Sequence, residues 1–252
     1  MTDETINKTN INSCQLSVLI AAYSEAANLI ELLPKLQTTI QNLTENYEII
    51  VIDTQYPVDD TMQVCKNNGV ICIPRRGGNN YGDAIRTGID ASKGEYIITM
   101  DADGSHNPKF IPLLWGKRAT AGVIIASRYI SGGKTDNPWL LVSLSRLLNL
   151  AFERLIHMPV LDVSNSFRLY KGDLLRKQHL KGLHFDILEE ILVKIAYDSS
   201  SYPASIIELP YHFEQRKHGK SKRNLFVFGV IFLAAIFRLR KIRDNHLAER
   251  TD

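Results

Sequence analysis

The stretch Glu95-Tyr96-Ile97-Ile98-Thr99-Met100-Asp101-Ala102-Asp103 is an apolar run that ends in two acids one residue apart. The run predicts a fully buried strand over residues 95–100. Carboxylates at positions i and i+2, where a strand ends in a loop, can both bind one hard cation, Mg²⁺ or Mn²⁺, which keeps open positions for a diphosphate. Asp-x-Asp also occurs in turns and helix caps. Asp101 and Asp103 are therefore a metal-site hypothesis that needs support from elsewhere in the chain.

Three similar strands precede this one, and each is followed by a helical pattern. The strands are expected at residues 16–22, 47–52 and 70–74, and the helices at residues 25–43, 59–68 and 81–92. Regular alternation of strands and helices predicts an α/β fold with a mostly parallel twisted sheet flanked by helices. Ligands bind beyond the carboxyl ends of such strands. Glu25, Asp53 and Asp101 each follow a strand end, so we expect these acids at one edge of the sheet.

The second half of the chain is less regular. Strands are expected at residues 123–126, 167–170 and 206–210, and helices at residues 139–155 and 185–197. The chain has no internal repeat, so we expect a single domain over residues 16–215. A polar tail over residues 1–15 is predicted to be disordered, and residues 216–252 are predicted to form a basic loop and an amphipathic C-terminal helix.

Composition and charge restrict the possible partners. The chain has 252 residues, 44% of them hydrophobic, and a formal net charge of only +3, which argues against a nucleic-acid partner. Basic residues nevertheless cluster between residues 216 and 243, which suits phosphates or an anionic membrane surface, although a solvated helix end is the alternative. The apolar run over residues 225–237 is too short to cross a hydrocarbon layer of about 30 Å. It predicts a buried helix, or a helix in the membrane interface or under a partner subunit, and the flanking basic residues favour the second interpretation.

The cysteines and the first residues of the chain indicate the compartment. Cys14, Cys65 and Cys72 lack the spacing of metal ligands, and residues 1–15 contain no apolar signal core. A sparse, odd set of cysteines fits a reducing cytosol, and a polar start argues against secretion. The sequence therefore predicts a cytoplasmic protein.

Several stretches form a pattern that is stronger together than any one of them alone. They are residues 19–29 (LIAAYSEAANL), 47–53 (YEIIVID), 94–103 (GEYIITMDAD), 105–112 (SHNPKFIP), 127–129 (SRY), 166–170 (SFRLY) and 218–222 (HGKSK). In this order and spacing the chain resembles the family 2 glycosyltransferases of the polyprenyl-phosphate hexosyltransferase type, typified by dolichyl-phosphate mannosyltransferase. The resemblance implies a GT-A-like fold, a nucleotide-diphospho-sugar donor (GDP-mannose or a UDP-hexose) and a Mg²⁺ or Mn²⁺ ion. It also implies a polyprenyl phosphate acceptor, met at the cytoplasmic face of a membrane directly or through a membrane partner subunit.

The resemblance also implies a donor site. Asp53 would contact the nucleobase or the ribose, with Glu25 nearby, and the cation on Asp101 and Asp103 would bridge the diphosphate. A cation in that place neutralises the charge that develops on the leaving nucleotide.

Further basic and hydroxyl side chains are implied at the phosphates. Planar guanidinium groups suit phosphate oxygens, and the resemblance gives this role to Arg128, Arg146 and Arg168. Ser221 and Lys222 would belong to a loop that closes over the diphosphate.

The implied reaction is an in-line displacement at the anomeric carbon with inversion. A lipid phosphate oxygen is already anionic at neutral pH, so a strong general base is not required. The implied catalytic residues are Asp162, Asp103 and Arg168. Asp162 would orient the acceptor or act as a weak base, and its alternative role is structural, in the turn of residues 164–166. Glu190, on the following helix, would order the site or belong to the helix surface.

Three positions depart from the family pattern. Thr54 stands where the family usually has a second acid, and Asn80 and Asn165 stand where it has glycines. Asn tolerates positive φ better than most residues, so the turn at Asn80 is expected to survive. Because Thr54 replaces that acid, the sequence does not determine which nucleotide the donor carries. Two alternative functions remain: a transferase with a soluble or polysaccharide acceptor, and a non-catalytic paralogue that binds nucleotide sugars.

Overall fold

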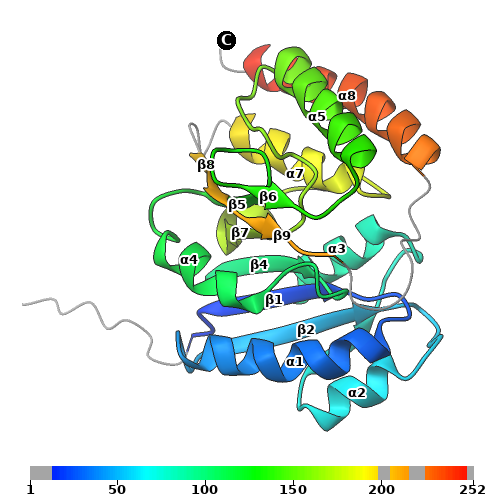
Figure 1. Cartoon of the computed structure of the whole chain (residues 1–252), viewed down its shortest axis with the longest axis vertical. Coiled ribbons are helices and arrows are strands. Elements are labelled where there is room, and N and C mark those ends of the chain that lie inside the picture. The colour runs from blue at the N-terminus through cyan, green and yellow to red at the C-terminus, as the bar shows by residue number, and fades with distance from the viewer. Residues whose placement is uncertain (1–12, 198–204, 216–224, 249–252) are drawn as a thin grey trace, which may run out of the picture.

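The computed structural model describes residues 13–197, 205–215 and 225–248 (Figure 1). In these residues seven strands form one sheet in the order β3-β2-β1-β4-β7-β5-β8. The strands are β1 (Leu16–Ala21), β2 (Tyr47–Asp53), β3 (Ile71–Pro74), β4 (Tyr96–Asp101), β5 (Val123–Ser127), β7 (Arg168–Lys171) and β8 (Ile206–Pro210).

The first four strands are parallel, as predicted, and β7 is the exception to the parallel arrangement. It lies between β4 and β5 and pairs antiparallel with both, whereas β5 and β8 are again parallel. The mostly parallel twisted sheet of the sequence analysis is therefore confirmed. Two short parallel strands outside the main sheet, β6 (Lys134–Thr135) and β9 (His212–Phe213), were not predicted.

Helices cover both faces of the sheet. They are α1 (Ala26–Gln41), α2 (Thr61–Asn67), α3 (Tyr81–Ala91), the short η1 (Pro108–Phe110) and α4 (Ile111–Gly116), α5 (Trp139–Ile156), α6 (Gly172–Arg176), α7 (Asp186–Tyr197) and α8 (Leu225–Ala248). Every helix and strand predicted at residues 16–210 is present, with ends within two residues of those expected. The additional short elements η1, α4 and α6 were not predicted.

The alternation of side chains along the strands divides the core into two layers. Val18 and Ile20 of β1 pack with the apolar face of α1, whereas Leu19, between them, packs with α3 on the opposite face. Successive side chains of a strand point to opposite faces, so a run without polar residues fits a sheet that is covered on both sides.

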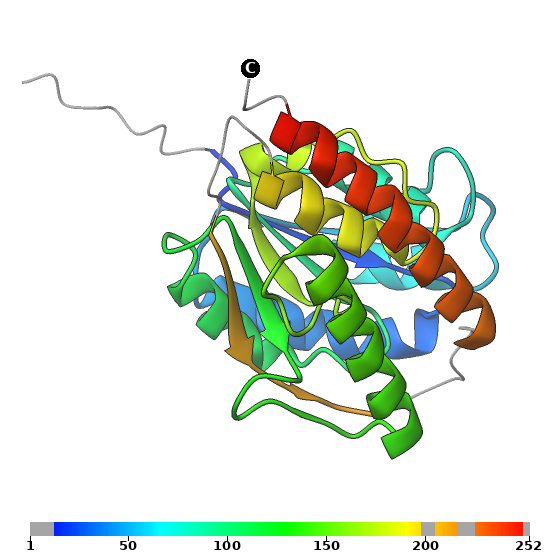
Figure 2. The ribbon, with the colours of Figure 1, turned by 90° about the horizontal axis from the view of Figure 1, so that it is seen from above.

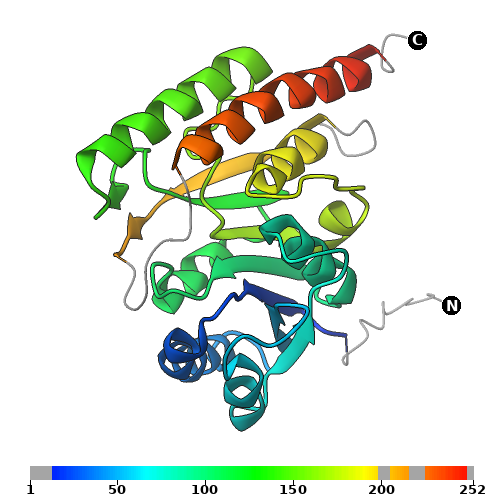
Figure 3. The same ribbon diagram turned by 90° about the vertical axis from the view of Figure 1, so that its right-hand side faces the viewer.

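The C-terminal helix packs on the rest of the molecule. Figures 2 and 3 show α8 beside α5 and α7, and these helices are in contact. Phe232, Ala235, Ile236 and Leu239 are buried in the second core layer. For this face of α8 the interpretation as a buried helix is right, whereas Leu233 and Phe237 of the same helix are exposed, so a covering by a membrane or a partner stays a prediction for them. The exposed side of α8 carries the apolar Leu233 and Phe237 beside the basic Arg240 and Lys241, so the predicted separation of apolar and polar faces is weak.

The first described residues belong to the sheet region. The carbonyls of Cys14 and Gln15 accept hydrogen bonds from the backbone of Glu95 and Tyr96. These two residues, which the sequence analysis placed in the tail, therefore continue the β1–β4 contact; residues 1–12 lie outside the described residues. None of the described helices is both long and apolar enough to cross a membrane.

Candidate active site

The carboxyl ends of β1, β2 and β4 bring acids to one edge of the sheet. In the strand register Ala21 lies opposite both Ile52 and Asp101, and Asp53 follows Ile52 directly. Glu25 stands at the N-cap position of α1, four residues after β1 ends; it is 7% exposed and accepts a hydrogen bond from Asn28 at 2.5 Å. The structure thus brings together the acids that the sequence pattern had placed at strand ends.

Asp101 and Asp103 are half-buried and held by serine hydroxyls. The Oδ1 atom of Asp101 accepts a hydrogen bond from the Ser166 hydroxyl at 2.8 Å. The Oδ1 atom of Asp103 accepts from the backbone and the hydroxyl of Ser105 at 3.0 and 2.5 Å. Gly104, at φ +83°, makes the turn between Asp103 and Ser105. Both carboxylates stay partly exposed, as a metal site at this edge requires.

The loop after the two acids is fastened by two aromatic residues whose role the sequence analysis missed. His106 accepts a hydrogen bond from the Asp101 backbone through Nδ1 at 2.9 Å. The Tyr211 hydroxyl accepts from the Asn107 backbone at 2.7 Å and donates to the Ser105 carbonyl at 2.8 Å. His106 belongs to the stretch of residues 105–112 quoted for the family resemblance, so the sequence could have marked it as a candidate. Nothing near Tyr211 in the sequence indicates its contact with this loop.

Asp162 is fully buried and forms a two-point ion pair with Arg128. The Arg128 side chain donates to the two Asp162 oxygens at 2.8 and 2.6 Å, and its backbone N–H donates to the same carboxylate at 2.8 Å. Burial alone would lower the pKa of the Arg128 guanidinium, but the Asp162 carboxylate raises it above its ordinary value. The geometry makes Asp162 the residue that orients Arg128, and its expected roles of orienting the acceptor or acting as a weak base stay predictions.

A second acid lies behind this ion pair. Glu208 of β8 accepts hydrogen bonds from the backbone of Leu161 and Asp162 at 2.9 and 3.0 Å, and burial raises the pKa of its carboxyl. Arg128 also donates to the Ser164 hydroxyl at 3.0 Å. Arg128 therefore links Asp162 to the turn of residues 164–166.

Arg168 does not reach the edge of the sheet. Its side chain has no exposed surface, and its guanidinium donates to the Leu188 carbonyl at 2.8 Å and to the Val163 carbonyl. The expectation that Arg168 contacts phosphate is contradicted by this placement. The guanidinium donors are thus directed at backbone carbonyls in the protein interior.

Arg146 lies close to Arg128, across a tyrosine. The guanidinium carbons of Arg128 and Arg146 are 5.0 and 5.6 Å from the centre of the Tyr129 ring. Cations are attracted to aromatic faces, so Tyr129 brings two positive charges to one place. Ser221 and Lys222 lie outside the described residues, so their predicted position over the diphosphate is not tested.

Asp53 is nearly closed off from solvent. It is 2% exposed; Oδ1 accepts from the Thr54 backbone at 2.8 Å, and Oδ2 is buried with no hydrogen-bond partner among the described residues. Burial raises the pKa of this carboxyl. Arg75, a residue not singled out from the sequence, lies next to it: its backbone donates to the Asp53 carbonyl at 3.0 Å and its guanidinium to the Asn79 carbonyl at 2.7 Å.

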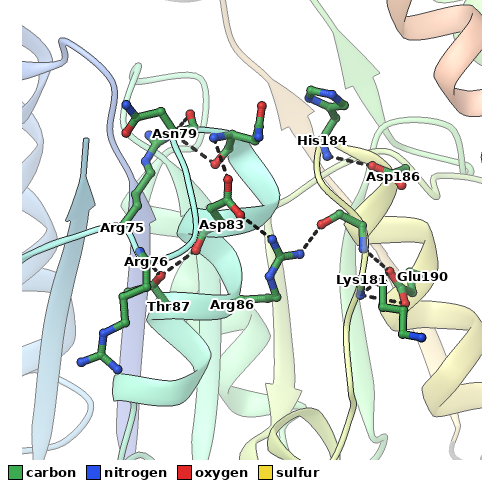
Figure 4. Close-up of polar contacts among 12 residues, drawn as sticks. Arg75, Arg76, Asn79, Asp83, Arg86, Thr87, Lys181, His184, Asp186 and Glu190 are labelled. Carbon is green, nitrogen blue, oxygen red and sulfur yellow. Dashed lines mark hydrogen bonds and ion pairs between the residues drawn. The ribbon is translucent and has the colours of Figure 1, made fainter. Parts of the chain in front are cut away.

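The start of α3 is fixed by a charged network, which Figure 4 shows. Asp83 accepts from the Asn80 backbone at 3.0 Å and from Arg86 at 2.5 Å, and Arg86 also donates to the Gly182 carbonyl. Asn80 has φ −77°, so this turn needs no residue in the left-handed region. The turn is present, but the expected reason, the tolerance of Asn for positive φ, does not apply.

Glu190 holds the other side of this network. It is 1% exposed, accepts from the Gly182 backbone at 2.6 Å and pairs with Lys194 at 2.9 Å. Of the two roles expected for this acid, the surface role is excluded. Glu190 orders the connection between α6 and α7.

Comparison with known proteins identifies the family. The profile described as "Glycosyl transferase family 2" matches residues 17–178. The chain belongs to glycosyl transferase family 2. It is 29% identical over 237 residues to a dolichol-phosphate mannosyltransferase of Pyrococcus furiosus, covering 90% of this chain and 64% of that protein. It is 28% identical over 220 residues to a polyprenol monophosphomannose synthase of Mycolicibacterium smegmatis, covering 81% of this chain and 79% of that protein.

Solved structures support the GT-A-like fold. Glucosyl-3-phosphoglycerate synthase from Mycobacterium tuberculosis, in complex with phosphoglyceric acid, matches with a TM-score of 0.70 and 18% identity, covering 90% of this chain and 80% of that one. The same synthase in complex with Mn²⁺, UDP and glucosyl-3-phosphoglycerate matches with a TM-score of 0.68, also at 18% identity, with the same coverage. At this identity the likeness shows the fold, and the ligands belong to the synthase.

Proposed function

We propose that this protein is a metal-dependent, inverting glycosyltransferase that moves a hexose from a nucleotide-diphospho-sugar to a polyprenyl phosphate. The observation that carries the proposal is the pair of half-buried carboxylates, Asp101 and Asp103, held by serines at the carboxyl edge of a sheet in a family 2 glycosyltransferase. The names of the two relatives favour a polyprenyl-type acceptor and mannose as the hexose.

The residues present fit a hard divalent cation. Mg²⁺ and Mn²⁺ prefer oxygen ligands, and Mg²⁺ is usually held by one or two carboxylates, waters and substrate phosphates. The described residues contain no group of three or more His, Cys, Asp or Glu side chains suited to a metal, so a cation here would share Asp101 and Asp103 with the donor diphosphate. When bound, the cation supplies positive charge at the leaving nucleotide.

The chain's own residues divide the remaining work. Arg128, oriented by Asp162, and Arg146 offer guanidinium groups on the second half of the sheet, where they would bind phosphate oxygens. Because the acceptor phosphate is already anionic, the reaction needs no side chain to remove a proton. Asp53, Glu25 and the loop of Ser221 and Lys222 would bind the nucleotide.

The outer helices offer a surface for the lipid side of the reaction. On α5 Trp139 is 78% exposed, and on α8 Phe237 is 70% exposed. Large apolar side chains near basic residues, here Phe237 with Arg240 three residues later, favour contact with an anionic membrane surface. A peripheral position on a membrane, at its cytoplasmic face, follows as part of the proposal.

Transfer to an extracted lipid tests the reaction. The protein is incubated with polyprenyl phosphate, Mn²⁺ or Mg²⁺ and radiolabelled GDP-mannose or UDP-glucose, and label in the organic phase is counted. We expect one donor to give a glycolipid, and Asp103→Ala to lower the rate by roughly two orders of magnitude or more. Asp90→Asn, at an exposed acid of α3, is the matched control and should leave the rate unchanged. Label only in a water-soluble product would indicate a soluble acceptor, and donor binding without turnover would indicate a non-catalytic paralogue.

Sedimentation with vesicles tests the membrane surface. The wild-type protein should co-sediment with vesicles of anionic phospholipid. The double substitution Trp139→Ser and Phe237→Ser should weaken this binding roughly tenfold. Leu113→Ser, at a 59% exposed position on α4, is the control and should bind like the wild type. Equal binding by all three proteins would contradict this surface.

A further inference from the structure

A continuous chain of hydrogen bonds crosses the sheet behind the metal motif. The Asp101 backbone N–H donates to His106 Nδ1 at 2.9 Å, His106 Nε2 lies 3.0 Å from Asn165 Oδ1, and Asn165 Nδ2 donates to the Ala126 carbonyl at 2.5 Å. This series of hydrogen bonds therefore runs from the end of β4 to Ala126 of β5, two residues before Arg128.

The chemistry of the end groups fixes every proton in this chain. A backbone N–H only donates, so Nδ1 of His106 accepts and the ring proton is on Nε2. A backbone carbonyl only accepts, so the NH₂ group of Asn165 faces Ala126 and its oxygen faces His106. All three side-chain contacts are satisfied by one arrangement, which is expected of buried polar groups.

Burial and packing keep this chain rigid. His106 has no exposed surface and Asn165 is 2% exposed, and the imidazole stacks on the Phe167 ring at 4.9 Å with an interplanar angle of 15°. The neighbouring Ser166 holds the Asp101 carboxylate from the same segment. Residues 165–167 thus hold Asp101 by both its main chain and its side chain.

We infer that His106 and Asn165 are positioning residues, which fix the direction of the Asp101 carboxylate toward a divalent cation without touching it. The inference rests on the proposed function in taking Asp101 as a metal ligand. Preorganised ligands bind metal more tightly than ligands that must be ordered on binding. Asn165, one of the departures from the family pattern, therefore contributes an amide that a glycine does not have.

Two substitutions at His106 separate the two hydrogen bonds. In His106→Asn the Asn oxygen takes the place of Nδ1 and still accepts from Asp101, whereas in His106→Gln the amide takes the place of Nε2 and leaves the Asp101 N–H without its acceptor. Mn²⁺ binding is measured by electron paramagnetic resonance with saturating UDP and, separately, GDP. We expect the dissociation constant of Mn²⁺ to rise roughly tenfold in His106→Gln and by less than about threefold in His106→Asn. His157→Asn, at an exposed helix end with φ +58°, is the control and should bind like the wild type.

Asn165→Ala tests the second link. It should weaken Mn²⁺ binding, and combining it with His106→Gln should add little, because both break the same chain. Thermal unfolding of each variant confirms that it is folded. Equal Mn²⁺ affinities for His106→Gln, His106→Asn and the wild type would overturn the inference, as would full additivity of the pair.

One readout does not depend on the metal. Nitrogen-15 spectra of the wild-type imidazole at neutral pH should show His106 with its proton on Nε2 and an unprotonated Nδ1. A proton on Nδ1 would overturn the inference even if the protein proved to be an active transferase. If the wild type binds no Mn²⁺ with either nucleotide, the metal site fails and the inference with it, while the tautomer shows whether the hydrogen-bond chain itself is correct.

Discussion

The two halves of the sheet present charged groups in different ways. On the half formed by β1, β2 and β4, Asp101 and Asp103 are half-buried and held by hydroxyl and backbone donors. On the half formed by β5, β7 and β8, Asp162 is fully buried and neutralised by Arg128.

The difference follows from what each carboxylate has to bind. An acid that is to bind a cation must keep oxygens near solvent. An acid that only orients an arginine gains from burial, because the low dielectric strengthens a pair whose geometry is good. Asp101 and Asp103 thus keep oxygens near solvent, whereas the charge of Asp162 is already matched by Arg128.

The largest effect on stability is expected at the matched pair. Asp162→Asn leaves the Arg128 guanidinium, whose side chain is only 9% exposed, without its counter-charge. Breaking a buried pair by removing one partner costs about 3–5 kcal/mol, which for a domain of this size lowers the midpoint of thermal unfolding by roughly 6 to 20 °C. Calorimetry or circular dichroism measures the shift.

The control for this prediction is an exposed pair. Asp136 pairs with His212 at 2.7 Å, but the two side chains are 44% and 55% exposed. Asp136→Asn should change stability by less than about 1 kcal/mol. If Asp162→Asn is no more destabilising than Asp136→Asn, the pair with Arg128 is not the organising feature of that half. The double variant Arg128→Met with Asp162→Asn should recover part of the loss, because no charge is then left unpaired.

A smaller effect is expected at the loop that carries the metal motif. Tyr211→Phe removes a hydroxyl that is bonded to the backbone of both Ser105 and Asn107. Leaving these groups without a partner should cost about 1–3 kcal/mol, with a rise in the Mn²⁺ concentration needed for half-maximal activity. Tyr47→Phe, whose hydroxyl makes an exposed contact with Gln41 at 3.2 Å, is the matched control. Equal stability of the two variants would mean that the Tyr211 hydroxyl does not hold the loop.

The half with the metal motif was the easier one to predict from the sequence. Its strands and helices alternate, each pairing is between parallel neighbours, and the acids at strand ends come together by register. The order of β7 between β4 and β5 was not predictable in the same way, because antiparallel pairing of distant segments leaves no local pattern. The two-residue strands β6 and β9 are too short to give any periodic signal.

Side-chain direction limited the prediction of the site. Residue type and position placed Asp101, Asp103 and Asp53 at the right edge, since a strand end determines where they lie. The same reasoning misplaced Arg168, because an arginine near a strand can serve phosphate or buried carbonyls equally well, and only the packing of α7 decides between them. His106 and Tyr211 were missed for a related reason: their partners are backbone groups, which every residue has.

The smallest effect on stability, and the one of opposite sign, is expected at Asp53. Burial raises the pKa of this carboxyl, and its Oδ2 atom has no hydrogen-bond partner among the described residues. The folded protein therefore binds this proton more tightly than the unfolded chain, so the contribution of Asp53 to stability is fully present at low pH and is lost as the pH rises through the folded pKa. Asp53→Asn, which keeps the shape but removes the charge, should stabilise the protein by up to about 1 kcal/mol at pH 7 and by less at pH 4. Thermal unfolding at the two pH values measures the difference. A wild type that is more stable than Asp53→Asn at pH 7 would mean that Arg75 compensates the buried charge, and Asp53 would then resemble Asp162 more than the half-buried Asp101 and Asp103.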